Sequence, residues 1–211
     1  MRRGFGREIE NEKEIMVGTH NTMTYLRAVS PLWEAISCWW RCQDKTLDEQ
    51  IAAGVRWFDI RIAYNNKPGG PLWKFAHGGA DLEYADGPGL RDVLERVEEC
   101  GGLVRVMLEK GDEEAEQLFA EYFNEGSTTK RWPCITGAVI KKGWRVLWSK
   151  GEPQLVDRSY VPYKRDTAWW KQLKGIAGFP WKSLKRRAKG GKRPAEWQWG
   201  KKGKVWIYDF V

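Results

Sequence analysis

The feature that most constrains the fold is an alternation of short apolar runs with amphipathic helical patterns over the first 123 residues. The runs have the length and β-branched content of buried strands, and the patterns repeat at helical spacing. Such alternation is typical of a parallel sheet or a (β/α) barrel. We therefore expect one α/β domain over residues 1–211. The predicted strands are 13–18, 55–62, 72–77 and 103–108, and the predicted helices are 46–53, 89–100 and 112–123.

Beyond about residue 130 the alternation is less regular. Residues 137–140 and 144–149 have strand patterns, and 166–176 has a short helical pattern. A Gly- and Trp-containing basic segment, 181–204, has the composition of a loop insertion. The chain closes with the apolar run 204–211, which we interpret as a last strand.

Charge is distributed unevenly along the chain. Residues 141–204 contain 19 Lys and Arg against four acidic residues, whereas residues 1–140 are net acidic. A cationic block of this kind attracts anionic partners, either lipid headgroups, nucleic acid or a phosphorylated substrate. No apolar stretch is long enough to span a membrane, and the N-terminus lacks the apolar run of a secretory signal. We expect a cytoplasmic or peripheral membrane protein, with four reduced and mostly buried cysteines.

Polar residues recur where predicted strands end. In parallel α/β folds the carboxyl ends of strands meet at one edge, and chemistry gathers there. Both histidines of the chain occupy such positions, and imidazole is the side chain whose ordinary pKa is closest to neutrality. The pattern predicts an acid–base pair. The residues in question are His20 and Asn21, Asp59 and Arg61, His77, Glu109 and Lys110, and Asp209.

These positions stand in motifs that resemble the X domain of the phosphatidylinositol-specific phospholipases C. The motifs occur in that family's order with roughly its spacing: GTHNT at 18–22, LDEQIAAGVRWFDIR at 47–61, AHGG at 76–79, LRDVLERV at 90–97, VMLEK at 106–110 and YDFV at 208–211. The resemblance implies an irregular, partly open TIM barrel. It also implies attack of the inositol 2-hydroxyl on phosphorus, which releases diacylglycerol and a cyclic inositol phosphate.

The resemblance assigns a role to each matching residue. His20 matches the general base, and His77 matches the general acid that protonates the leaving oxygen. Asp209 matches the acid that orients the base imidazole, a role like that of the carboxylate in a Ser-His-Asp triad. Arg61, two residues after the strand acid Asp59, matches the arginine that faces the phosphoryl oxygens in the metal-independent bacterial enzymes.

Two residues of the motifs depart from the bacterial pattern. Asn21 and Glu109 are the types found in the calcium-dependent members of the family. Together with Asp59 they would offer three oxygen ligands to Ca²⁺, which takes six to eight with waters among them. We favour a site without metal, and the calcium site is the alternative.

Substrate and membrane contacts are less constrained by the sequence. Lys110, Lys150 and Tyr163 are candidates for contacts with the sugar or the phosphate. Tryptophans lie among the cations of 181–204, which is typical of a peripheral enzyme on an anionic bilayer. We therefore expect a monomer whose partner is a phosphatidylinositol-like lipid. We expect no nucleic acid, because no nucleic-acid motif is present.

Two other functions are compatible with such a barrel. A glycerophosphodiester phosphodiesterase also has two histidines, but that family has HRG, ENT and ExD motifs where this chain has HNT and DIR. A catalytically idle barrel that binds lipid or another polyanion is the alternative outside enzymes, and the intact histidine pair argues against it.

Overall fold

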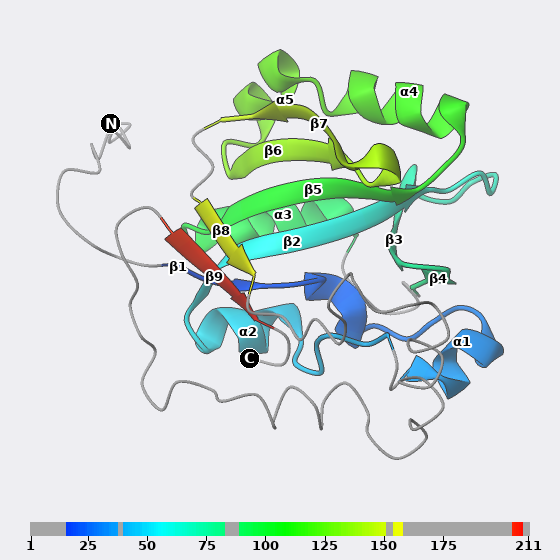
Figure 1. Cartoon of the computed structure of the whole chain (residues 1–211), viewed down its shortest axis with the longest axis horizontal. Coiled ribbons are helices and arrows are strands. Elements are labelled where there is room, and N and C mark those ends of the chain that lie inside the picture. The colour runs from blue at the N-terminus through cyan, green and yellow to red at the C-terminus, as the bar shows by residue number, and fades with distance from the viewer. Residues whose placement is uncertain (1–15, 38–39, 83–88, 151–153, 158–203, 209–211) are drawn as a thin grey trace, which may run out of the picture.

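The computed structural model describes residues 16–37, 40–82, 89–150, 154–157 and 204–208 of the 211-residue chain. These residues form a nine-stranded mixed sheet with the order β7-β6-β5-β2-β1-β9-β8, from which β3 and β4 extend beside β2 (Figure 1). The strands are β1 (Met16–Thr19), β2 (Val55–Tyr64), β3 (Trp73–His77), β4 (Ala80–Asp81), β5 (Leu103–Lys110), β6 (Ile135–Ile140), β7 (Arg145–Ser149), β8 (Gln154–Asp157) and β9 (Lys204–Tyr208).

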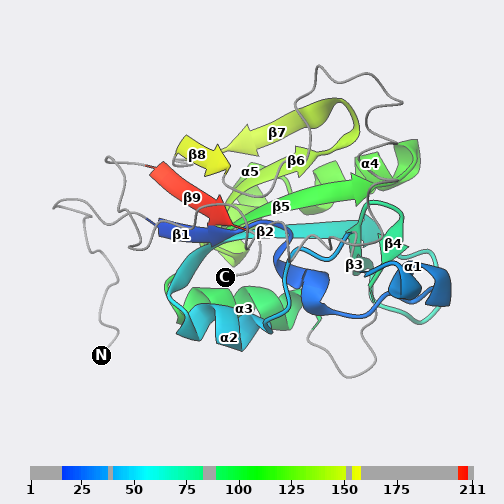
Figure 2. The ribbon, with the colours of Figure 1, turned by 60° about the horizontal axis from the view of Figure 1, so that its bottom comes forward.

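Helices cover the sheet and join its strands. In Figure 2, α2 and α3 lie together on one side of the sheet. The helices are α1 (Pro31–Ala35), α2 (Leu47–Ala52), α3 (Leu90–Glu99), α4 (Glu113–Tyr122) and α5 (Glu125–Arg131), with the 3-10 turns η1 (Thr22–Tyr25) and η3 (Lys142–Trp144).

The central strands are parallel, as the alternation in the sequence predicts. β1 pairs with β2 and β9, β2 with β5, β5 with β6, and β8 with β9, all in parallel. The first and last described strands are therefore neighbours in the sheet, and neither of them is an edge strand. Among the described residues no pairing joins the edge strands β7 and β8, so the sheet is open. The mixed α/β class is confirmed, and a TIM barrel stays a prediction.

The long strand β2 separates an apolar face from a polar one. Phe58, Ile60 and Ile62 are fully buried in the core cluster, to which α3 contributes its apolar stripe. Because side chains alternate along a strand, Asp59 and Arg61 point to the opposite face. The same alternation gives β5 an apolar face and a face that carries Arg105 and Glu109. The functional site is built on this second face.

The sequence interpretation is wrong about how β3 joins the sheet. β3 runs antiparallel to β2, with Phe75 opposite Ile62 and Trp73 opposite Tyr64. It is the return strand of a hairpin rather than the next strand of a parallel alternation. The hairpin carries His77 back toward the level of Arg61. β7 is likewise antiparallel to its neighbour β6.

The predicted helices 46–53, 89–100 and 112–123 correspond to α2, α3 and α4 and are confirmed. Cys42 and Cys134 are buried free thiols, as expected, and Cys100 is a partly exposed one. No helix of the described residues is long and apolar enough to cross a membrane. The predicted helix 166–176 and the basic segment 181–203 lie outside the described residues.

Candidate active site

The site begins in a short turn after β1. Asn21 has φ 49° and ψ 55°, a left-handed conformation that Asn adopts more readily than most residues. This conformation turns the Asn21 backbone N–H to the Asp59 carboxylate, at 3.3 Å. Two buried glutamines fix the turn, since the Gln43 side chain donates to the carbonyl of His20 and that of Gln50 donates to the carbonyl of Thr22, each at 3.0 Å. The motif GTHNT is thus a rigid support for His20.

Arg61 lies at the centre of the site and is 6% exposed. Its Nε donates to Asp59 at 2.9 Å, its Nη1 donates to Glu109 at 3.1 Å, and its Nη2 donates to His20 Nε2 at 2.9 Å. Burial alone would lower the pKa of this guanidinium, but the two carboxylates outweigh burial and raise it. Arg61 is therefore a fixed cation that links His20 to two carboxylates.

Asp59 is completely buried and accepts from two arginines. One oxygen binds Arg61, and the other binds Arg105, with Nη2 at 2.9 Å and Nε at 3.3 Å. Burial would raise the pKa of Asp59, but the charges of Arg61 and Arg105 hold it far below its ordinary value. This carboxylate is therefore ionised at neutral pH.

Glu109 joins the other side of the site. It binds Arg61 through one oxygen, and through the other it accepts from the Lys141 ammonium and, at 2.6 Å, from the backbone N–H of Gly78. Burial opposes its charge, yet Arg61, Lys141 and the Gly78 amide lower its pKa. Glu109 therefore ties the end of β5 to the residue that follows His77.

The structure explains why the AHGG motif has glycine at both of its last two positions. Gly78 has φ 56°, which favours glycine, and this conformation presents its N–H to Glu109. A side chain at Gly79 would collide with the ring of Trp33. The two glycines let the hairpin bring His77 close to Arg61 and α1.

The two imidazoles face one another with ring centroids 6.5 Å apart and planes at 82°. The side-chain amide of Asn21 lies between them, with Nδ2 3.1 Å from His20 Nδ1 and 3.0 Å from His77 Nε2. The thiol of Cys42 is 3.2 Å from the same nitrogen. Two imidazoles on either side of the Asn21 amide, one of them bonded to Arg61, are able to exchange protons with a bound phosphodiester.

His77 is kept neutral in this arrangement. Burial lowers the pKa of its imidazole most, and Arg61, His20 and Lys141 add to the effect against the opposing charge of Glu109, which brings the pKa to about 3. Trp40 packs edge-on against the ring, with centroids 6.2 Å apart. A group bound here must supply negative charge before His77 becomes protonated near neutral pH.

The structure brings together most of the predicted site residues but not all of them. His20, Asn21, Asp59, Arg61, His77 and Glu109 form one connected group. Lys110 instead pairs with Asp81 at 2.6 Å and donates to the Gly79 carbonyl at 2.9 Å, so it fastens the hairpin. Lys150 does not join the group, because its backbone pairs with Thr136 at the opposite end of β6. Asp209 and Tyr163 lie outside the described residues.

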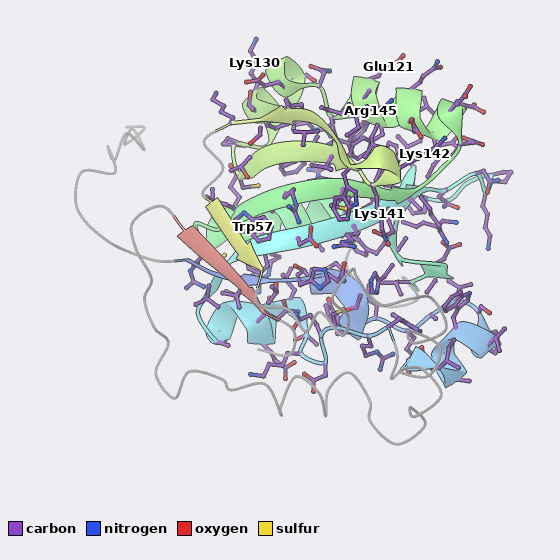
Figure 3. All side chains as sticks on the ribbon, in the orientation of Figure 1. Trp57, Glu121, Lys130, Lys141, Lys142 and Arg145 are labelled. Atoms are coloured by element: carbon purple, nitrogen blue, oxygen red, sulfur yellow. The ribbon has the colours of Figure 1, made fainter. Side chains whose placement is uncertain are left out.

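Sequence reasoning missed two cations of the site, Arg105 and Lys141. Figure 3 labels Lys141, beyond the end of β6, and Trp57, on which Arg105 stacks. A charged residue inside the apolar run LVRVML was the available signal for Arg105. Lys141 directly follows a fully buried strand, the same signal that identified Glu109 and Lys110.

The alternative calcium ligands can be tested against this geometry. Asp59 and Glu109 both accept hydrogen bonds from Arg61, so a guanidinium stands where a cation shared by the two carboxylates would bind. Within the described ranges no group of three or more His, Cys, Asp or Glu side chains is placed to hold a metal ion. The residues do not fit Ca²⁺ in this arrangement.

Two solved bacterial enzymes are similar to this structure. Phosphatidylinositol-specific phospholipase C from Listeria monocytogenes matches with a TM-score of 0.53 and 14% sequence identity, over 93% of this chain and 88% of that chain. This chain has the fold of that enzyme. The corresponding phospholipase C from Staphylococcus aureus, in a structure concerned with its membrane binding, matches with a TM-score of 0.47 and 16% identity, over 95% of this chain and 74% of that chain. No protein-family model and no curated protein matches the sequence.

At 14% identity the likeness to the Listeria phospholipase C establishes the fold and leaves the chemistry to the residues present. The resemblance seen in the motifs is thus confirmed at the level of the fold.

Proposed function

We propose that this protein is a phosphodiesterase of the phospholipase C type. It would cleave phosphatidylinositol-like diesters by attack of the inositol 2-hydroxyl on phosphorus. His20 removes the hydroxyl proton, the new P–O bond forms, and the bond to the glycerol oxygen breaks as His77 protonates that oxygen. The observation that carries the proposal is the pair of imidazoles, 6.5 Å apart, beside a buried arginine that bonds to one of them.

The contact between Arg61 and His20 suggests how the base is activated. An arginine can only donate, so His20 Nε2 offers its lone pair to Arg61 Nη2 at 2.9 Å. An anionic phosphoryl group is a stronger acceptor than a neutral imidazole. When it binds, Arg61 Nη2 turns to the phosphoryl oxygen and releases the His20 lone pair for the hydroxyl proton.

The low pKa of His77, about 3, suggests how the acid is charged. The imidazole is neutral in the free protein, and the negative phosphoryl group raises its pKa by favouring the cation. Substrate and proton therefore bind together. The acid is present only when a diester occupies the site, which suits protonation of its leaving group.

We propose further that Arg61 supplies the positive charge that a metal would otherwise supply. Its guanidinium is fixed by Asp59 and Glu109, and fixed charges stabilise a transition state without reorganisation. Cleavage should therefore persist in excess EDTA or EGTA. Loss of activity on chelation with recovery on added Ca²⁺ would instead support a calcium site made by Asn21, Asp59 and Glu109.

An anionic membrane surface is the proposed place of action. The support is the basic, Trp-containing segment 181–204, of which residues 181–203 lie outside the described part of the chain. Each cation near such a surface adds on the order of 1 kcal/mol of binding at low salt. Replacing Lys185, Arg186, Arg187 and Lys189 by Gln should weaken binding to anionic vesicles and leave cleavage of a short soluble substrate unchanged.

The direct test is ³¹P NMR of phosphatidylinositol micelles incubated with the protein. The proposal predicts the resonance of a five-membered cyclic inositol phosphate as the first product. Glycerophosphoinositol incubated in parallel distinguishes the alternative, because a glycerophosphodiester phosphodiesterase gives a phosphate monoester without a cyclic intermediate. Absence of cleavage of either substrate, with vesicle binding retained, would support an idle lipid-binding barrel.

A further inference from the structure

Arg105 stands one strand away from Arg61 and takes no part in the chemistry proposed above. It lies on β5 directly beside Asp59 in the β2–β5 register. Its side chain is 15% exposed, and its guanidinium carbon lies 5.1 Å from the centroid of the fully buried Trp57 ring. Burying a charged side chain costs free energy unless the charge is paired. The group that pairs with Arg105 therefore indicates what Arg105 does.

The partner is the oxygen of Asp59 that Arg61 does not use. Arg105 donates to it through Nη2 at 2.9 Å and Nε at 3.3 Å, while Arg61 Nε binds the other oxygen at 2.9 Å. Asp59 thus divides one negative charge between two guanidinium groups. The connection continues from Arg61 to Glu109 and from Glu109 to Lys141. We call Arg105, Asp59, Arg61, Glu109 and Lys141 the charge cluster.

The charge cluster contains three cations and two carboxylates, so it keeps one positive charge. The low pKa values of Asp59 and Glu109 hold both carboxylates ionised, and His77 is neutral. Without Arg105 the cluster would have two cations and two carboxylates. Asp59 would then neutralise Arg61 alone, and the site would lose its net attraction for an anion.

We infer that Arg105 is a positioning residue that acts through Asp59 and gives the site the net positive charge with which Arg61 binds a phosphoryl group. The inference rests on the proposed function, because that function makes Arg61 the phosphate contact. It requires no direct contact of Arg105 with the substrate. It also explains why an arginine occurs within the otherwise apolar run 103–108 and stacks on Trp57 of β2.

The test measures binding of inorganic phosphate to the full chain by isothermal titration calorimetry at low ionic strength. Arg105→Gln should bind phosphate about tenfold more weakly, the order expected for one charge several ångströms from the anion at a protein-like dielectric. Arg105→Lys keeps the charge and should bind within about threefold of the wild type. Arg91→Gln is the matched control, because Arg91 is an exposed arginine of α3 that pairs only with Glu95 in the described contacts. This variant should bind phosphate with the affinity of the wild type.

The decisive variant is Arg105→Gln combined with Asp59→Asn. It restores one net positive charge, and Asn still offers an oxygen to Arg61 Nε, so phosphate affinity should recover toward the wild type. A merely structural role for Arg105 predicts that the double variant binds as weakly as Arg105→Gln or more weakly. That result, or wild-type phosphate affinity in folded Arg105→Gln, would overturn the inference, and so would failure of the wild type to bind phosphate.

Unfolding curves in urea for every variant separate lost binding from lost structure. If Arg105→Gln does not fold, the double variant and Arg105→Lys still decide the question, because neither leaves a buried carboxylate without its cation. The outcome is also separable from the proposed function. Phosphate binding that depends on Arg105, without any diester cleavage, would support the inference and contradict the proposed enzymatic function. Diester cleavage with a phosphate affinity that does not depend on Arg105 would support the proposed function and contradict the inference.

Discussion

The charge cluster and the surface of α3 contain the same residue types in opposite settings. On α3, Arg91 pairs with Glu95 at 2.8 Å, and Arg96 of α3 pairs with Asp48 of α2 at 2.7 Å, with all four side chains between 45% and 73% exposed. In the site, distances of 2.9 to 3.1 Å join Arg61 to Asp59 and Glu109, which are 6% exposed or less. The distances within the ion pairs are similar in the two regions, and the exposure of the side chains to solvent differs.

Water and salt screen the pairs of α3, which therefore do little more than keep that face soluble. The site cannot rely on water, so each buried carboxylate needs a cation and each cation needs a carboxylate. The interdependence makes the site sensitive to single charge changes, and it shifts the pKa values of Asp59, Glu109 and His77. Matched substitutions in the two regions measure how much burial of the charges contributes to activity and to stability.

The largest contrast is expected in activity. Arg61→Gln should lower kcat for phosphodiester cleavage about 10³-fold, since a fixed donor to the phosphoryl oxygens is lost. Arg61→Lys should also be strongly impaired, because one ammonium cannot replace contacts to two acids and a phosphoryl group. Arg91→Gln should retain wild-type kcat. Equal activity of Arg61→Lys and the wild type would remove Arg61 from the proposed mechanism.

The next contrast is in the free energy of unfolding. Glu109→Gln leaves Arg61 and Lys141 without a shared carboxylate in a buried site, which should destabilise the fold by about 3 kcal/mol. Glu95→Gln removes the partner of Arg91 on α3 and should leave the urea midpoint unchanged. A midpoint for Glu109→Gln within error of that for Glu95→Gln would mean that solvent reaches the charge cluster freely.

The smallest contrast, taken over one pH unit, is in the pH dependence of stability. His77 has a pKa of about 3 when folded against an ordinary 6.5, so between these values the unfolded chain binds the proton and the folded chain does not. The free energy of unfolding should fall, as pH decreases through that window, by up to about 1.4 kcal/mol per pH unit. His77→Gln should flatten the slope, although Asp59 and Glu109, whose pKa values are also lowered, preserve part of it below about pH 4. An unchanged slope would mean that His77 titrates normally.

The sequence predicted the site residues that follow strands but not their partners. His20 and Arg61 were accessible because polar residues at the ends of apolar runs are unusual and both lie in recognisable motifs. Arg105 was not, because its role depends on the register that places it beside Asp59, and register is a property of the folded sheet. Lys141 could be assigned to the site only with the knowledge that β6 ends beside Glu109.

The same limit explains the errors in the fold. Asn65, Asn66 and the Pro-Gly-Gly that follows are residues of tight turns, but a loop of that composition also fits a crossover, so the hairpin of β3 was missed. Pro31, the first residue of α1, and Asn124, which caps α5 through Ser127, were local helix signals that hydrophobic spacing did not reinforce. Helices as short as these are not predicted by a method that depends on hydrophobic periodicity.

The measurement that tests the central claim most directly compares His20→Ala and His77→Ala on two soluble inositol phosphodiesters, one with an alkanol and one with p-nitrophenol as the leaving group. Both variants should lose about 10² to 10⁴-fold in rate on the alkyl ester. On the p-nitrophenyl ester, whose leaving group needs little protonation, His77→Ala should recover most of its activity and His20→Ala should not. Equal recovery of the two variants, or wild-type rates in either one on the alkyl ester, would contradict the assignment of His20 as base and His77 as acid.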